Sequence, residues 1–310
     1  MDSNASSLDP VTEYLIEENL PDEFGRVPVF PPIVLDLFAA CREGRDGMAA
    51  AALEAARRIH RYYHEEFVPS DPLERCWNLG MNEFLPSLYG MIFETARLIS
   101  YDDEHDRQEA LVQVLVELRK LPEVTFRRSY NCEKEIAFVN DQWFAYVERE
   151  LKRIYFVHYR DFRIDDYESS SSSGDPKDLK TSCNEWVSIS AFLARCLRAG
   201  ICDNDKRRCL KPWIDIRFAL EEDTGNLPEA VRNSLRIIAA QYILLYGRPI
   251  YNHMASQITA TETAKKWSLW AAKLKELLQE GRGNGIDEKL ASVLKRTLAE
   301  VESIASDVAA

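Results

Sequence analysis

The sequence predicts an all-α protein, a single domain over residues 1–310 with about ten to twelve helices. Helical periodicity recurs from one end of the chain to the other, whereas the alternation typical of strands is nearly absent. Glycine is scarce, with 12 residues in 310. Apolar side chains make up 46% and charged ones 29%, so the chain can bury a sizeable core.

Two apolar stripes in the middle of the chain predict amphipathic helices with defined ends. The segment DDEHDRQEALVQVLVELRKLP carries the first stripe and stops at Pro122. The second stripe covers residues 231–246 and is expected to end at Gly247 and Pro249, because both residue types favour helix termination.

Further helices and one loop complete the expected organisation. Residues 267–278 form a stripe that EGRGNG terminates, and residues 286–304 form the last one. A helix is also expected over residues 133–158. The segment DDYESSSSSGDPKD, residues 165–178, has nothing to bury, so we expect a flexible loop within the domain.

Charge and cysteine content limit the classes of partner and compartment. The formal net charge of −12 argues against nucleic acid and anionic membranes, which reward clustered Lys and Arg. No run approaches the roughly 20 apolar residues that span a bilayer, so we expect a cytoplasmic protein without membrane insertion. The seven cysteines include no C-x-x-C, which favours reduced thiols over disulfides or a metal site.

Five packing motifs resemble one protein family: EWVSISAFLARCLRAG, WIDIRFALEE, QYILLYG, KWSLWAAKLKEL and DRQEALVQVLVELRKLP. The last of these comes first in the chain, and in their chain order the five motifs resemble the fungal family known as domain of unknown function 3632, over roughly residues 70–305. The resemblance implies an all-helical cytosolic protein. Because some such proteins are encoded among natural-product biosynthesis genes, it also implies a small hydrophobic ligand. No catalytic residues are established for the family, so the candidate sites depend on this chain alone.

The acidic motif DDEHD, residues 102–106, has two interpretations. It fits the D-D-x-x-D pattern with which class I terpene cyclases hold magnesium and a diphosphate, if Asp102, Asp103 and Asp106 share a helix face. The alternative is the start of the next helix, where aspartate is favoured as N-cap beside the positive end of the dipole. The second metal motif of those cyclases has no match, so we favour the helix start and predict no metal cofactor.

The expected helix over 133–158 places polar residues on an apolar stripe. Asn140, Glu150 and His158 fall on the same side as Trp143. Facing a cavity, the carboxylate and imidazole could transfer protons, because burial raises the pKa of a glutamate towards neutrality. The alternative is that the helix ends before His158 and that Glu150 pairs with a neighbouring Lys or Arg.

Arg217 is the strongest candidate for a buried, oriented cation. On a helical wheel it lies about 40° from Trp213, within the apolar side of WIDIRFALEE. A guanidinium is always charged and presents a rigid fork that could bind a carbonyl, enolate or carboxylate. The structural alternative is a buried bridge to Glu221 at i+4. Tyr242 and Tyr246 share one stripe, where aromatic residues more often form core than contact ligands.

These observations predict a cofactor-independent cyclase of fungal secondary metabolism, such as one catalysing an intermolecular hetero-Diels–Alder reaction on a polyketide or terpenoid. Such a reaction needs orientation and a few hydrogen bonds, in a hollow lined by aromatic rings. The expected catalytic residues are Arg217, Tyr242, Tyr246, Glu150 and His158, and the expected substrate-binding residues are Trp143, Trp186, Trp213 and Asn140. The expected partner is a small hydrophobic molecule. A homodimer is the oligomeric state that we consider alongside a monomer. The alternatives are a magnesium-dependent terpene cyclase and a non-catalytic helical binding protein.

Overall fold

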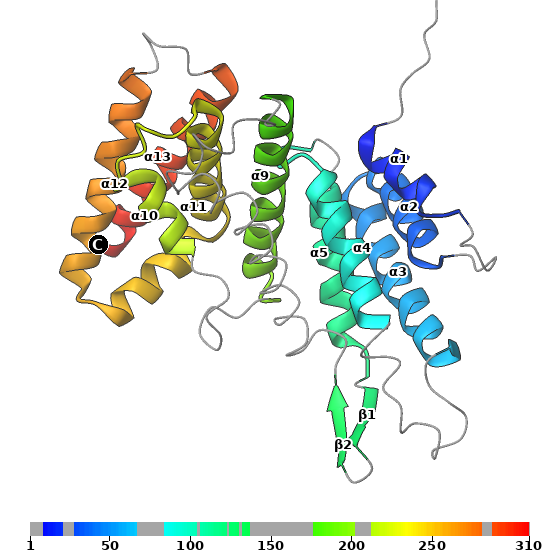
Figure 1. Cartoon of the computed structure of the whole chain (residues 1–310). Coiled ribbons are helices and arrows are strands. Elements are labelled where there is room, and N and C mark those ends of the chain that lie inside the picture. The colour runs from blue at the N-terminus through cyan, green and yellow to red at the C-terminus, as the bar shows by residue number, and fades with distance from the viewer. Residues whose placement is uncertain are drawn as a thin grey trace, which may run out of the picture. The chain divides into compact units, whose positions relative to one another are not determined.

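The computed structural model describes residues 9–20, 28–66, 84–103, 106–122, 124–129, 132–136, 176–201, 212–280 and 287–309. These residues form ten helices and one two-stranded hairpin (Figure 1). The all-α class and the expected number of helices are therefore confirmed. None of the described helices is both long enough and apolar enough to cross a bilayer.

The chain divides into two compact units, residues 1–149 and 150–310, and each is described by itself. The described elements of the first are α1 (Pro10–Glu17), α2 (Phe30–Cys41), α3 (Arg45–Glu66), α4 (Leu85–Leu98), α5 (Arg107–Lys120), β1 (Val124–Ser129) and β2 (Cys132–Ile136). Those of the second are α9 (Pro176–Arg198), α10 (Pro212–Leu220), α11 (Glu229–Gln257), α12 (Ala260–Glu280) and α13 (Glu288–Ala309). The expectation of one domain over 1–310 stays a prediction. The expected loop, 165–178, lies outside the described residues except for its last three, which belong to α9.

The first unit is built around α3, which packs against α2 and α5. Small residues make close packing of α3 possible, because Ala52 and Ala56 are fully buried on its inner face. The hollow that α2 to α5 enclose measures only about 10 Å³, about the least space that a single water molecule requires. This part of the unit is therefore a solid core. Helix α5 ends before Pro122, as the sequence predicts.

A β-hairpin replaces the start of the helix expected over 133–158. Strand β2 pairs antiparallel with β1, in a register that places Val124 opposite Ile136 and Thr125 opposite Glu135. The segment VTFRRS mixes β-branched and aromatic residues with polar ones, a composition that suits a strand paired with its neighbour. The helix prediction is thus wrong for residues 133–136, and the remainder of that range lies outside the described residues.

The second unit is organised around α11, which packs against α9, α10 and α13, while α12 packs mainly against α13 (Figure 1). Aromatic rings fill its core. The Trp267 ring lies 4.9 Å from that of Trp270 and 5.3 Å from that of Tyr251, between centroids. The Trp267 indole also donates a hydrogen bond of 3.0 Å to the Val301 carbonyl of α13. One cluster therefore joins three helices.

Helix α11 continues through the point where the sequence predicted its end. It kinks at Tyr246, whose φ of −143° and ψ of 18° are not helical, and then runs through Pro249 to Gln257. Pro249 falls in the first turn after the kink, where a missing N–H costs no helical hydrogen bond. A Cβ at Gly247 would lie 2.9 Å from Cδ1 of Ile304, so glycine permits the close approach of α13.

Candidate functional site

The predicted site residues are only partly within the described part of the chain. Four of them lie outside it: Asn140, Trp143, Glu150 and His158. The other five belong to the second unit: Trp186 on α9, Trp213 and Arg217 on α10, and Tyr242 and Tyr246 on α11. The proton-handling pair expected on one helix therefore stays a prediction, and the geometry of the candidate site depends on α9, α10 and α11.

Two of these aromatic residues are core residues. Tyr242 is 2% exposed and Trp186 is 9% exposed. Tyr246 is half-buried and lies at the kink of α11. The two tyrosines of one predicted stripe therefore lie in different environments, Tyr242 in the core and Tyr246 at the kink.

Arg217 is a partly exposed cation, so its expected burial is wrong. Its side chain is 42% exposed, and Nη2 lies 3.4 Å from Oε1 of Glu222. The guanidinium carbon lies 5.7 Å from the centre of the Trp213 ring, in a cation–π arrangement. Its Nε–H is buried and has no hydrogen-bond acceptor among the residues that the structure describes. Arg217 is therefore oriented from two sides while part of its donor capacity stays unused.

The expected partner of Arg217, Glu221, is engaged elsewhere. Its carboxylate accepts hydrogen bonds from Nε1 of Trp270 at 2.8 Å and from Nζ of Lys266 at 3.1 Å. The backbone N–H of Glu221 still donates to the Arg217 carbonyl at 2.7 Å, but the Glu221 side chain binds residues of α12 instead of the guanidinium. The bridge predicted between them is wrong, and Glu221 instead ties the end of α10 to α12.

An open groove of about 820 Å³ lies at the C-terminal end of α10. Its walls come from the α10–α11 connection, the first turns of α11, and α12. Apolar side chains in the groove include Leu220, Leu269 and Leu277, and charged ones include Glu222 and Arg232. Its size is in the range of small-molecule sites. None of the five described site residues lines it, but Glu222 connects it to Arg217.

Asp215 is a titratable residue of α10 that sequence reasoning missed. It is half-buried between Ile214 and fully buried Ile216. Burial raises the pKa of its carboxyl from 3.8 to about 7. The available signal was a carboxylate between two isoleucines in WIDIRF, but acidic residues are also favoured in the first turn of a helix.

Replacing Asp215 with asparagine is expected to stabilise the protein by about 1–2 kcal/mol at neutral to alkaline pH. Because its pKa is raised in the folded state, Asp215 binds more protons there than in the unfolded chain. The contribution of Asp215 to the stability of the wild type therefore falls as pH rises from 3.8 to about 7. The half-buried carboxylate keeps part of its hydration, which limits the gain. Urea unfolding at several pH values measures the difference in stability between Asp215→Asn and the wild type. This difference should vanish near pH 3.8.

The exposed Glu288, in the first turn of α13, supplies the control. Glu288→Gln should give no stabilisation that grows between acidic and neutral pH. A stability of Asp215→Asn that follows the wild-type curve at every pH would contradict the raised pKa of Asp215.

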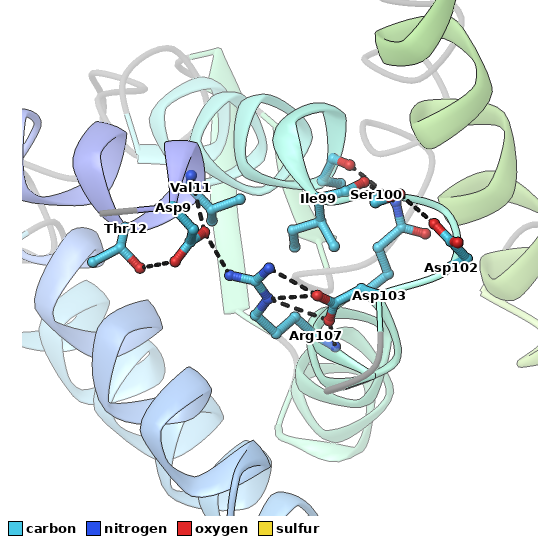
Figure 2. Close-up of polar contacts among 10 residues, drawn as sticks. Asp9, Val11, Thr12, Ile99, Ser100, Asp102, Asp103 and Arg107 are labelled. Atoms are coloured by element: carbon cyan, nitrogen blue, oxygen red, sulfur yellow. Dashed lines mark hydrogen bonds and ion pairs between the residues drawn. The ribbon is translucent and has the colours of Figure 1, made fainter. Parts of the chain in front are cut away.

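The DDEHD motif forms a helix start in the first unit (Figure 2). Asp103 accepts a hydrogen bond of 3.0 Å from the backbone N–H of Arg107 and pairs with its guanidinium at 2.8 Å. Asp102 accepts from the Ser100 hydroxyl instead. Asp106 occupies the N-cap position of α5 in the left-handed region, with φ 53° and no side-chain cap bond. The helix-start interpretation is confirmed, with Asp103 as the capping side chain.

The motif aspartates therefore have different partners and do not converge on one point. Within the described ranges, which omit Glu104 and His105, no three His, Cys, Asp or Glu side chains form a group that could hold a metal ion. Arg107 also pairs with Asp9, Nη1 to Oδ1 at 2.8 Å, which ties the start of α1 to the start of α5 (Figure 2). A second groove of about 550 Å³ is lined in part by Asp9, Asp102, Asp103 and Arg107.

The family model described as "Protein of unknown function (DUF3632)" matches residues 89–289. The match begins within α4, ends at the start of α13 and includes all five described site residues. No curated protein and no solved structure matches the chain. Because the matched segment is more than half of the 310 residues, the chain belongs to this family of unknown function, DUF3632.

Proposed function

We propose that this protein is a cofactor-independent cyclase of fungal secondary metabolism that catalyses an intermolecular hetero-Diels–Alder reaction on a polyketide or terpenoid. The observation that carries the proposal is the oriented, partly exposed guanidinium of Arg217, which lies over Trp213 and beside Glu222 of the adjoining groove. The expected substrate is a small hydrophobic molecule that carries a carbonyl group.

The reaction requires little of the protein in chemical terms. A hetero-diene and an alkene combine so that three π bonds become two σ bonds and one π bond, and no atom, proton or electron leaves. The two requirements are alignment of the reactants and a donor to the carbonyl oxygen of the electron-poor partner. Arg217 can supply that donor, because its charge is permanent and its orientation is set before the substrate binds.

The groove supports the binding of an apolar reactant. Leu269 is 51% exposed and lines the same hollow as Leu220 and Leu277, so it contributes accessible apolar surface to the groove. Hydrocarbon surface buried against the exposed Leu269 side chain stabilises a complex by about 25 cal/mol per Å². Glu222 both lines the groove and pairs with Arg217, and the proposal requires that a carbonyl group bound in the groove reach the guanidinium past this pair.

The proposal is tested by mixing the purified protein with an α,β-unsaturated ketone as hetero-diene and a cyclic terpene alkene. The expected result is an adduct whose mass is the sum of the two reactants, formed faster than in buffer and with an enantiomeric excess. Arg217→Met should lower the initial rate by about 100-fold, as removal of a single oxyanion donor does. Mass spectrometry of the denatured protein should also detect any co-purified polyketide or terpenoid, which then replaces the test reactants.

Arg296→Met is the matched control, because Arg296 is exposed on α13 of the same unit. It should leave the rate unchanged, and the melting temperature of both variants shows whether either one is unfolded. An Arg217→Met variant that keeps full activity contradicts the role of Arg217. A co-purified ligand that binds but is never converted would identify a binding protein instead of an enzyme.

A further inference from the structure

Two histidines lie one helical turn apart on α3 of the first unit. His60 and His64 are separated by four residues, which places them on the same face of the helix. Their Nε2 atoms are 3.2 Å apart and their ring centroids are 4.4 Å apart. His64 is exposed and His60 half-buried, so a solute can reach the pair from one side.

The separation of the two nitrogens matches that of two ligands on one metal ion. Imidazole nitrogens bind Zn²⁺ at about 2.05 Å, so a tetrahedral angle at the metal sets two of them about 3.3 Å apart. An angle of 90° gives about 2.9 Å by the same arithmetic. The observed 3.2 Å lies between these values. The separation of the two nitrogens is therefore compatible with coordination of one ion by both.

His60 also has an outer-shell partner of the kind that metal-binding histidines use. One of its ring N–H groups donates a hydrogen bond to the backbone carbonyl of Pro122, after the end of α5. Because Nε2 faces His64, we assign this bond to Nδ1. A histidine held in this way presents the lone pair of Nε2 outward, and the bond fixes both the tautomer and the ring orientation.

We propose that His60 and His64 form a binding site for a divalent transition-metal ion, with both Nε2 atoms as ligands. Imidazole favours Cu²⁺, Ni²⁺ and Zn²⁺, whereas Mg²⁺ and Ca²⁺ prefer oxygen ligands. Two histidines leave the remaining coordination positions to water or to another donor, so the ion is exchangeable. The site belongs to the first unit and is independent of the chemistry proposed for Arg217.

The alternative explanation for the short distance is a hydrogen bond between two neutral rings, one donating its Nε2–H to the other. That arrangement has the same separation between the nitrogens, but it predicts that added metal ions do not bind to the pair. Metal binding requires instead that His64 present its Nε2 lone pair, and the exposed ring can change tautomer at little cost.

The test is isothermal titration calorimetry of the untagged protein with CuCl₂, NiCl₂, ZnCl₂ and MgCl₂ at about pH 7.5. We expect one ion per chain, an affinity for Cu²⁺ above that for Ni²⁺ and Zn²⁺, and no binding of Mg²⁺. His64→Gln should weaken binding by more than about 10-fold, the least that loss of an outer-shell partner alone costs.

His253→Gln, in the second unit, is the control and should bind each ion like the wild type. His64 is exposed, so its replacement should leave the circular dichroism spectrum unchanged. Electron paramagnetic resonance of the Cu²⁺ complex should show hyperfine coupling to two nitrogens in the wild type and to one in His64→Gln. A wild type that binds none of the three transition metals overturns the proposal, and so does a His64→Gln variant with unchanged affinity and coupling.

Discussion

Replacing Trp267 with alanine is expected to lower the free energy of unfolding by about 3–5 kcal/mol. The side chain is fully buried, and its ring packs against Trp270 of the same helix and Tyr251 of α11. Truncation removes this burial and leaves a cavity where α11, α12 and α13 meet, because helices that support one another cannot collapse fully into the space. Urea unfolding followed by circular dichroism measures the loss.

Two variants separate burial from other effects of changing α12. Leu269→Ala, two residues away, removes a side chain that is 51% exposed and should change stability by less than about 0.5 kcal/mol. Trp267→Phe should cost much less than Trp267→Ala, because the Val301 carbonyl can keep its bond within α13 when the indole N–H is lost. Equal effects of Trp267→Ala and Leu269→Ala would show that the aromatic cluster does not hold the unit together.

The features that the sequence predicts well are local. The apolar stripe over 267–278 gives the buried face of α12, with Trp267, Trp270 and Leu274 all in the core, and the helix ends at Glu280, the first residue of EGRGNG. Helix α5 likewise ends before Pro122. Periodicity and stop signals act within one or two turns, so neighbouring residues contain the information needed.

The features that the sequence misses depend on contacts between distant segments. Gly247 and Pro249 predict the end of a helix, yet α11 continues, because its second half packs against α13. Glu221 reads as the partner of Arg217, yet Trp270 and Lys266, more than forty residues later, bind its carboxylate. A local pattern cannot reveal a competitor that comes from another helix.

The candidate site shows the same division. The helical wheel correctly associates Arg217 with Trp213, because a residue at i+4 is a neighbour on any helix. Burial is a tertiary property, so the wheel misjudges the exposure of Arg217 and overlooks the environment that raises the pKa of Asp215. Propensity also fails for residues 133–136, where pairing with β1 selects a strand.

Replacing Arg107 with methionine is expected to lower the free energy of unfolding by roughly 2–4 kcal/mol at neutral pH. The Arg107 side chain is 15% exposed, that of its partner Asp103 is 10% exposed, and a second carboxylate, Asp9, approaches from the start of α1. Removing the cation leaves two carboxylates near each other, one of them buried without its counter-charge. Methionine preserves much of the packing against Phe38, so the loss reports mainly on charge.

The pH dependence of this loss has a defined direction. Burial raises the pKa of Asp9, but hydrogen bonds from Thr12 and Arg107 outweigh it, so the pKa of Asp9 lies below its usual value of 3.8. A lowered native pKa gives stability that is present above the pKa of the unfolded chain and lost as pH falls through the native pKa. The difference between wild type and Arg107→Met should therefore shrink below about pH 4.

A double-mutant cycle with Asp103→Asn isolates the pair. If the cost of Arg107→Met arises from an uncompensated buried carboxylate, the double variant should be less destabilised than the sum of the two single variants. Arg58→Met is the matched control, because the partner of Arg58, Asp36, is 69% exposed and an exposed pair contributes less than about 1 kcal/mol. Additive effects of Arg107→Met and Asp103→Asn would show that Asp103 starts α5 through backbone capping alone and that its charge is not coupled to that of Arg107.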